Sequence, residues 1–516
     1  MRSQPNILLI MADQLTAGAL RAYGNTVCKT PHLDQLFARG THFEQVYCNF
    51  PLCAPSRASM LTGRLASRVG VYDNACEFAA QAPTIPYYLS ALGYSTTLSG
   101  KMHFVGPDQL HGYRERLTTD IYPSDFGWTP DWQQAIPVAA TGLNLRSVVE
   151  SGQCRRSLQL EYDDEVEFKA VQKLREMGRQ PAAKPFFLTV SLTHPHNPYV
   201  ISSTYWDRYE HADIDMPRIA PLPAAELDPH SGRLRQIYKF DEYDVTDADV
   251  RRSRHAYYAM VSYVDDQVGV LLETLQEMNL ADDTVIVFTS DHGDMLGERG
   301  LWYKWMFFEG AMRIPLVIAA PGQEPARVAH PVSLVDLMPT LLGLASQNRA
   351  PLVPVAPQDG TDLLRPGLAP DRPVFAEMTG DGAFSPCLMV RKRQWKYIFC
   401  EDDPPQLYDL HVDPDERFNR SGEETTASIE RELLDYLHAQ WDVRALKEAM
   451  ATSARQRLFI QNTRQAGDFV GWDYEPRRDA SRQFVRSGGA ASATTVKGLA
   501  RFPFVSPKPP DHPGQS

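Results

Sequence analysis

Polar side chains capable of metal or acid–base chemistry follow directly after four apolar runs of the sequence. Short apolar runs of this kind are typical of buried strands. In an open parallel sheet, ligands bind just beyond the carboxyl ends of the strands, so residues at these positions should meet at one edge. They are Asp13 and Gln14, Lys101 and His103, His194 and His196, and Asp291 and His292. Four strands that deliver such groups together predict a functional site.

Four of these residues are suitable ligands for one divalent cation. Asp13, Gln14 and Asp291 offer oxygen atoms and His292 offers an imidazole nitrogen, which suit calcium or manganese. Taken singly, Asp13 is also explained as a turn residue at a strand end, and Asp291-His292 as a polar turn or helix cap. Their combination on neighbouring strand ends favours a metal site. The imidazole favours manganese slightly, and calcium stays open.

The segment Cys53–Arg64, CAPSRASMLTGR, is the most specific feature of the chain. A proline-containing turn runs into a short helix, which places Cys53 just before the helix N-terminus. Free backbone N–H groups and the helix dipole favour an anion there, and Arg57 adds a permanent positive charge. From these residues alone, Cys53 is either an activated thiolate nucleophile or a buried structural cysteine.

Cys-x-Pro-Ser-Arg at Cys53–Arg57, followed by Thr-Gly-Arg, resembles the signature of the sulfatase family. Further matching motifs lie at Gly100–His103, Pro195–Pro198, Asp291–Gly293 and Leu407–Leu410. The resemblance implies that a maturation enzyme converts Cys53 to formylglycine and that position 53 is also a metal ligand. The hydrated aldehyde would attack sulfur through one oxygen, and its second hydroxyl would later expel sulfate.

The resemblance also implies roles for the charged residues around that position. Together with the metal, three cationic side chains would neutralise negative charge in the transition state. They are Arg57, Lys101 and Lys304. His196 would protonate the leaving group, while His103 would orient the formylglycine hydroxyls or assist the release of sulfate. We expect His194, separated from His196 by one proline, to be structural.

Within that family, the run Gly100–Gly127 and the following Trp128 resemble the choline sulfatases. This resemblance predicts choline O-sulfate as the substrate. A quaternary ammonium group is attracted to aromatic ring faces, and the candidates for substrate binding are Trp128, Phe104, Trp302 and Asn144. Each of the three aromatic residues is alternatively a core or interface side chain.

Two departures from the choline sulfatase pattern leave other substrates open. That pattern has His-Asn where this chain has Leu143-Asn144, and its tail brings an acidic residue to the ammonium group, whereas Ser487–Thr495 contains none. The alternatives are an aryl or alkyl sulfatase, a phosphonate monoester or phosphodiester hydrolase of the same superfamily, and a non-catalytic binder of quaternary amines. The resemblance also implies a homo-oligomer, either a dimer or a tetramer.

A scaffold of alternating strands and helices must position these residues. A helix is predicted from Pro31 to Gly40, with Thr30 as its N-cap, and another over about Arg254–Leu280. The strand candidates are Asn6–Met11, Ser95–Ser99, Pro185–Leu192, Thr284–Ser290 and Leu316–Ala320. This pattern predicts an α/β fold with a large, mostly parallel sheet flanked by helices. The resemblance makes that fold alkaline phosphatase-like.

The chain divides into three predicted regions. We expect a catalytic domain over residues 1–375, with a Pro-rich surface linker at about 351–373. A smaller α+β subdomain should follow over residues 376–462, because Cys387–Phe399 alternates like a half-exposed antiparallel strand. The loop Leu407–Asn419 and a helix near Ala427–His438 would complete it. Residues 463–516 would form an extended tail that docks on the core or on a neighbouring subunit.

Composition limits the remaining function classes. The 516 residues include 52 basic and 64 acidic side chains, for a formal charge of −12, which argues against a nucleic-acid partner. No apolar run approaches the roughly 18 residues of a membrane span, and the N-terminus lacks the apolar stretch of a secretory signal. Seven scattered cysteines without a CxxC spacing argue against a disulfide framework. We therefore expect a cytoplasmic enzyme that acts on a small-molecule sulfate ester.

Overall fold

Five parallel strands form the core of an eight-stranded sheet in this computed structural model, which describes residues 4–122, 124–131, 141–179, 184–346 and 352–466. The order of the strands is β12-β2-β11-β9-β1-β7-β4-β5. The parallel strands are β9 (Thr284–Ser290), β1 (Asn6–Ala12), β7 (Phe186–Ser191), β4 (Ser95–Gly100) and β5 (Glu115–Arg116). The prediction of a large, mostly parallel sheet is confirmed.

The central strand β1, with the sequence NILLIMA, is buried along its whole length. A strand covered on both faces has no solvent side, which explains its continuous apolar run. Met11 pairs with Ser191 of β7, and Ala12 pairs with Ser290 of β9. Because these strands end at the same level, the polar residues that follow them lie at one edge of the sheet.

The other half of the sheet is antiparallel where β11 (Leu316–Ala319) pairs with β9 and with β2 (Thr41–Phe43). A parallel neighbour of β9 would need a long crossover connection, usually a helix. Residues 291–315 instead form loops with short helical turns and the two-residue strand β10, so the chain returns beside β9 in the opposite direction. The remaining short strands are β12 (Ala326–Val328), β10 (Arg313–Ile314), β3 (Val46–Tyr47), β13 (Val332–Ser333), β6 (Gly152–Cys154) and β8 (Val200–Ser202).

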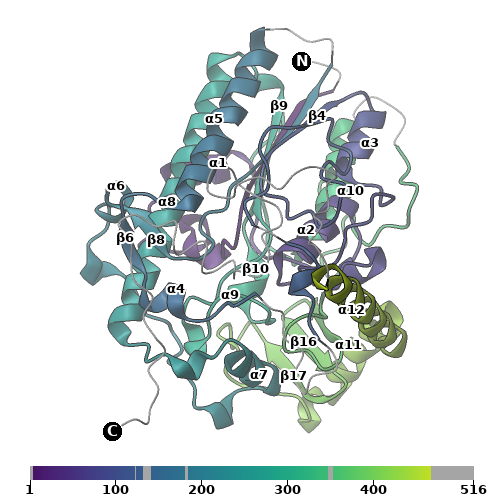
Figure 1. The fold of residues 1–516 in the computed structure, drawn as a ribbon. Coiled ribbons are helices and arrows are strands. Elements are labelled where there is room, and N and C mark those ends of the chain that lie inside the picture. Colours follow the sequence, from purple (N-terminus) through teal and green to yellow (C-terminus); the bar gives the residue numbers. More distant parts are fainter. Residues whose placement is uncertain (1–3, 123, 132–140, 180–183, 347–351, 467–516) are drawn as a thin grey trace.

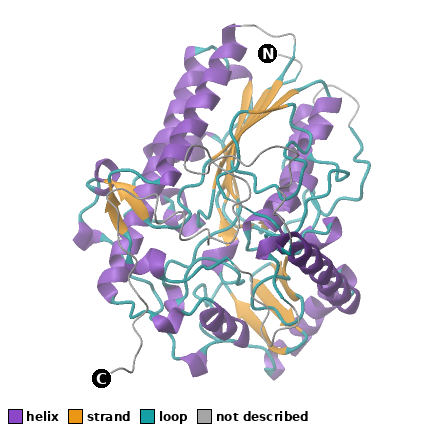
Figure 2. Cartoon of the chain, viewed as in Figure 1, coloured by secondary structure: helices purple, strands orange, loops and turns teal. Residues whose placement is uncertain are grey.

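Helices cover both faces of the large sheet (Figures 1 and 2). On one face lie α1 (Pro31–Arg39), α5 (Leu158–Arg179) and α8 (Asp247–Glu277), and on the other lie α2 (Cys53–Thr62), α3 (Ile85–Ala91) and α10 (Leu337–Ala345). Further helices are α4 (Arg146–Val149), α6 (Ser203–Trp206), α7 (Pro229–Ile237) and α9 (Glu309–Met312). None of the described helices combines the length and the apolar character needed to cross a bilayer.

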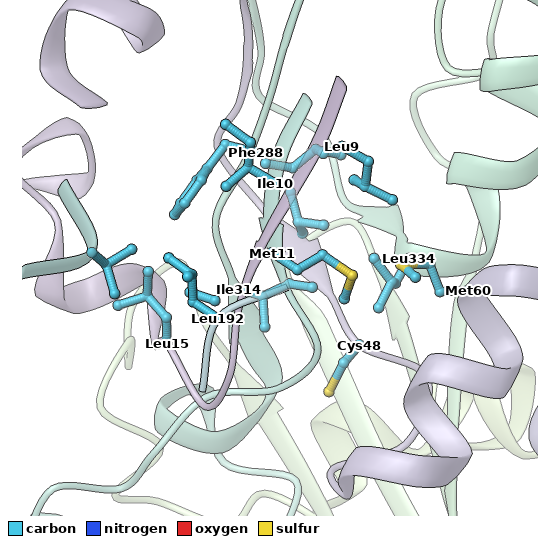
Figure 3. Close-up of a cluster of buried hydrophobic side chains, with 14 of the residues drawn as sticks. Leu9, Ile10, Met11, Leu15, Cys48, Met60, Leu192, Phe288, Ile314 and Leu334 are labelled. Atoms are coloured by element: carbon cyan, nitrogen blue, oxygen red, sulfur yellow. The ribbon is translucent and has the colours of Figure 1, made fainter. Parts of the chain in front are cut away.

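The core between sheet and helices joins segments that are far apart in the sequence. Figure 3 shows Met11 of β1, Phe288 of β9 and Met60 of α2 in one cluster. All three side chains are completely buried. This packing fixes α2, which begins at Cys53, against the strands whose ends carry Asp13 and Asp291.

A separate four-stranded antiparallel sheet follows in the C-terminal part of the chain. Its strands are β14 (Val374–Met378), β15 (Cys387–Lys392), β16 (Trp395–Cys400) and β17 (Asp403–Asp409), and α11 (Ala427–Gln440) contacts two of them. The loop predicted from Leu407 begins inside β17. The chain then continues as α12 (Val443–Gln465), a helix that the sequence analysis did not predict. Most of the predicted tail, residues 467–516, lies outside the described residues.

Candidate active site

Cys53 is the first residue of α2, rather than the residue before it as predicted, and its side chain is buried. Its Sγ lies 3.1 Å from Nε2 of His292, 3.5 Å from Nζ of Lys304 and 3.9 Å from Oδ1 of Asp13. Side chains from the ends of β1 and β9 and from a later loop therefore converge on the first turn of α2.

Asp13, Cys53, Asp291 and His292 form a compact, fully buried set of donor atoms within 4.8 Å of one another. The Nδ1 atom of His292 lies 3.0 Å from the carbonyl oxygen of Gly293, so Nδ1 donates a proton and Nε2 presents its lone pair to the cluster. Two carboxylates, one imidazole and the group at position 53 fit a divalent cation. The donor set therefore supports the predicted metal site and leaves the identity of the ion open.

Two buried cations lie beside the carboxylates of this cluster. Nε of Arg57 donates to Oδ2 of Asp291 at 2.8 Å, and Lys101 forms an ion pair with Asp13. Burial alone would raise the pKa of Asp291, but the Arg57 guanidinium, together with His292 and Lys101, outweighs it and holds that pKa below its usual value. Nη2 of Arg57 is buried without a hydrogen-bond acceptor among the described residues. The arrangement thus places a positive charge beside each carboxylate and leaves one donor for an anion.

A glycine shapes the turn that delivers Lys101. Gly100 has φ +107°, and a Cβ there would lie 2.0 Å from the carbonyl oxygen of Ser191. Only glycine fits this close approach. The backbone N–H of Lys101 then donates to the same oxygen at 3.0 Å. The end of β4 is thereby tied to β7, with Lys101 directed at Asp13.

Lys304 bridges three groups on different segments. Its Nζ donates to Oε1 of Gln14 at 2.6 Å, lies 2.9 Å from Nε2 of His196 and approaches Cys53. Nδ1 of His196 lies 2.7 Å from the carbonyl oxygen of Asn197, so Nδ1 carries a proton and Nε2 accepts from Lys304 in the neutral ring. Lys304 and His196 therefore form one proton-carrying pair beside position 53.

The electrostatic setting of Cys53 favours a negative charge. Burial by itself would raise the pKa of the thiol, but the ammonium groups of Lys101 and Lys304, with the neighbouring His292 and His103, together outweigh it and hold that pKa well below its usual value. A site that stabilises an anion at position 53 is equally suited to a bound oxyanion. The local charge is thus opposite to the formal charge of −12 of the whole chain.

His103 and Trp128 form one wall of the site. Their ring centroids lie 6.1 Å apart, edge to face. Both ring nitrogens of His103 are buried without a hydrogen-bond partner among the described residues, as expected of a group that meets a ligand. His103 and Gln14 also have positive φ angles of 57° and 65°. Such backbone conformations cost about 1–3 kcal/mol each and cluster at functional sites.

Other predicted residues lie in different surroundings. Phe104 is buried against Phe78 and His111, while Trp302 is buried against Tyr199. The side chain of Asn144 caps a turn by accepting from the backbone N–H of Arg146. The structure does not bring these three predicted substrate contacts together with His103 and Trp128 by any described contact, so their role in substrate binding stays a prediction.

His194 lies beside the site rather than at its centre. Its Nδ1 contacts Asp163 at 2.6 Å, and the same carboxylate accepts from the backbone N–H of Thr193 and His194. Asp163 thus fastens the loop that follows β7, which agrees with the structural role expected for His194. The sequence carried no signal for Asp163, because it lies on α5.

Several residues that contact the site were not singled out from the sequence. The hydroxyl of Tyr122 accepts from Gln159 at 2.7 Å, and its ring lies 4.4 Å from Nζ of Lys101. The side-chain oxygen of Asn74 accepts from the backbone N–H of Ala54 at 2.9 Å. These residues sit in loops or on helix faces without strand-end spacing. Only their position after folding reveals them.

The chain matches known families along most of its length. The family model described as Sulfatase matches residues 5–347, and the model described as Choline sulfatase enzyme C terminal matches residues 448–502. The sequence is 43% identical to Choline-sulfatase of Rhizobium meliloti over 97% of this chain and 99% of that protein. It is 29% identical to Arylsulfatase K of Gallus gallus over 92% of this chain and 91% of that protein.

Solved structures with the same fold include a phosphonate monoester hydrolase from Silicibacter pomeroyi. That structure matches with a TM-score of 0.69 and 24% sequence identity over 85% of this chain and 95% of its own. A phosphonate monoester hydrolase of Agrobacterium radiobacter matches with a TM-score of 0.66 and 25% identity over 86% of this chain and 96% of its own. These likenesses establish the arrangement of the sheet and helices around the site.

Proposed function

The chain belongs to the sulfatase family, and from this premise we propose that it hydrolyses choline O-sulfate to choline and sulfate. The choice of substrate rests on one relative that matches this chain over nearly its whole length. The choline-sulfatase of Rhizobium meliloti matches over 97% of the chain at 43% identity, and the family model described as Choline sulfatase enzyme C terminal matches residues 448–502.

Position 53 is proposed as the nucleophile. When Cys53 is converted to the formylglycine expected of this family, the hydrated aldehyde supplies an oxygen nucleophile and a second hydroxyl for releasing sulfate. Nζ of Lys304 lies 3.5 Å from Sγ of Cys53, close enough to orient a hydroxyl group on the formylglycine carbon. His103, with both ring nitrogens free of protein partners among the described residues, is proposed to hold or move a proton on these hydroxyls.

Charge on the sulfate group is proposed to be neutralised from two sides. A calcium or manganese ion held by Asp13, Gln14, Asp291, His292 and position 53 would supply positive charge against the sulfate oxygens. Arg57 and Lys101 add fixed positive charge at the same end. All these groups are buried, and charges in a site without bulk water act more strongly than in solution.

The leaving group of choline O-sulfate is an aliphatic alkoxide, which needs a proton as the bond to sulfur breaks. His196 and Lys304 are proposed to deliver it, because Nε2 and Nζ lie 2.9 Å apart and share one face of the site. The carbonyl oxygen of Asn197 holds Nδ1 of His196, so the ring presents Nε2 to the substrate. This pair is the general acid of the proposed reaction.

The cationic end of the substrate is proposed to lie against Trp128. A quaternary ammonium group has no N–H to donate, and an aromatic face attracts it by about 0.5–2 kcal/mol. The ring of Trp128 lies beside His103. Phe104, Trp302 and Asn144 remain secondary candidates for substrate contacts.

We further propose the division into residues 1–375, 376–462 and 463–516, a cytoplasmic location, and a dimer or tetramer. The oligomer and a dedicated maturation enzyme for Cys53 are implied by the family. Size-exclusion chromatography with light scattering measures the oligomeric state. Co-expression with and without a formylglycine-generating enzyme, followed by an assay of activity, tests the requirement for a maturation enzyme.

A substrate panel tests the proposed function directly. Enzyme with a converted position 53 is assayed for kcat/KM on choline O-sulfate, 4-nitrophenyl sulfate, a phenyl phosphonate monoester and a phosphodiester. The proposal predicts the highest value for choline O-sulfate. Negligible hydrolysis of choline O-sulfate alongside ready turnover of another ester would contradict it, and binding of choline without any turnover would identify a binding protein.

A further inference from the structure

Helix α12 reaches from the C-terminal part of the chain to the substrate side of the site. It packs against the turn Phe126–Trp128, more than three hundred residues earlier in the sequence, and Figure 1 shows it in front of α2. Its residue Arg457 is only 5% exposed. A long charged side chain is rarely buried so deeply unless it is paired.

Arg457 joins two segments that are otherwise linked by the hydrogen bond from Oγ of Ser124 to the carbonyl oxygen of Asn74. Its Nη1 and Nη2 donate to Oδ1 and Oδ2 of Asp73 at 2.8 Å and 2.7 Å, and Nη1 also donates to Oγ1 of Thr129 at 3.0 Å. A planar guanidinium matches a carboxylate in this two-bond arrangement, which fixes direction as well as distance. Asp73 and Thr129 are therefore held at a set separation.

Each of the two segments carries a residue of the site. Asp73 precedes Asn74, whose side-chain oxygen holds the backbone N–H of Ala54, next to the nucleophile position. Thr129 follows Trp128, whose ring lies beside His103. Together with the hydrogen bond between Ser124 and Asn74, this buried side chain of the C-terminal helix ties the aromatic wall to the start of α2.

We propose that Arg457 is a positioning residue that fixes Trp128 against the nucleophile and thereby gives the enzyme its preference for cationic sulfate esters. The inference rests on the proposed function, because it assigns Trp128 to the cationic end of the substrate. Arg457 itself touches no reacting atom. It acts through Thr129 on one side and Asp73 on the other.

The two ends of the substrate should depend on Arg457 to different degrees. The sulfate end is held by groups on other elements, and α2 is additionally fastened by the hydrogen bond of Ser56 Oγ to the carbonyl oxygen of Asp291 at 2.6 Å. The position of Trp128 instead depends on a short turn that is tied to its surroundings by Ser124 before it and by Thr129 at its end. Loss of Arg457 should therefore weaken binding of the cation more than it slows attack on sulfur.

The test compares Arg457→Met and Arg457→Lys with Arg455→Met, a control on the same helix whose exposed side chain bonds to Thr452. KM and kcat are measured for choline O-sulfate and 4-nitrophenyl sulfate. Because displacements of about 1 Å cost up to about a hundredfold, we expect Arg457→Met to raise KM for choline O-sulfate about tenfold. We expect KM for 4-nitrophenyl sulfate to change by less than about threefold in the same variant. Arg457→Lys should give an intermediate KM for choline O-sulfate, and Arg455→Met should match the wild type.

Hydrogen–deuterium exchange supplies a readout that needs no substrate. Exchange over residues 124–131 should increase in Arg457→Met and stay unchanged in Arg455→Met. If Arg457→Met fails to fold because Asp73 is left as an unpaired buried charge, Thr129→Val is used instead, since it keeps the ion pair and removes only the link to the Trp128 turn.

The outcomes separate this inference from the proposed function. A wild type that hydrolyses 4-nitrophenyl sulfate but not choline O-sulfate would contradict the proposed function, whatever the exchange data show. Unchanged exchange over residues 124–131 in a folded Arg457 or Thr129 variant would overturn the positioning role. The positioning role would also be overturned if the wild type prefers choline O-sulfate and the Arg457 variant loses activity equally on both substrates.

Discussion

Replacing Lys304 by methionine tests the acid pair most sharply. The ammonium group of Lys304 lies within 3.5 Å of Gln14, His196 and position 53, so it faces the point where charge develops. Removing one such donor from a buried site typically costs about 10²–10³ in kcat, or about 2.7–4 kcal/mol. Methionine keeps the length and apolar stem of lysine, so packing changes little.

The leaving group divides that loss into two parts. For 4-nitrophenyl sulfate the departing phenolate is already a good leaving group, and only the electrostatic part of about 10²-fold should appear. For choline O-sulfate the alkoxide also loses its proton donor, which adds a further factor of at least about 10. The assay is kcat for both esters, in Lys304→Met and in Lys447→Met as a surface control on α12.

Conversion of position 53 must be measured in each preparation, because a variant that escapes modification would lose activity for another reason. Equal losses for the two esters at full conversion would refute the assignment of Lys304 and His196 as the acid pair. A loss of less than about tenfold for both would refute the electrostatic argument as well.

Three further results are expected. Trp128→Leu should raise KM for choline O-sulfate by about 10–30-fold with little effect on 4-nitrophenyl sulfate, because it removes a cation–π contact of up to about 2 kcal/mol. Asp13→Asn should leave the protein folded but lower its metal content well below one ion per chain, measured by inductively coupled plasma mass spectrometry. Burial raises the pKa of Asp265 to about 6, so the unfolded chain ionises first and the free energy of unfolding falls by up to about 3 kcal/mol as the pH rises from about 4 to 6. Urea denaturation at several pH values should show that Asp265→Asn loses this fall.

The residues at strand ends could be predicted from the sequence because strand geometry alone brings them together. Asp13 and Asp291 directly follow fully buried strands that end in register, so no knowledge of the loops was needed. The motif around Cys53 added the helix. At these positions the local sequence pattern and the order of the strands lead to the same placement, so these two kinds of information were enough for the prediction.

Contacts made by loops and polar helix faces could not be predicted in this way. Tyr122 and Asn74 reach the site from irregular segments, where no periodicity links position to neighbour. Helix α12 was missed because its buried face includes Arg457 and Gln461, which weakens the apolar repeat that marks an amphipathic helix. These charged and polar contacts become favourable only when the partner segments are already in place.

The nucleophile at position 53 is the central claim, and its chemical form can be measured directly. Mass spectrometry of the peptide containing position 53, after alkylation of free thiols, gives the fraction that carries an aldehyde in each preparation. The account predicts that choline O-sulfate hydrolysis rises in proportion to this fraction and vanishes at zero conversion. Full activity in enzyme whose Cys53 is entirely unmodified would contradict it.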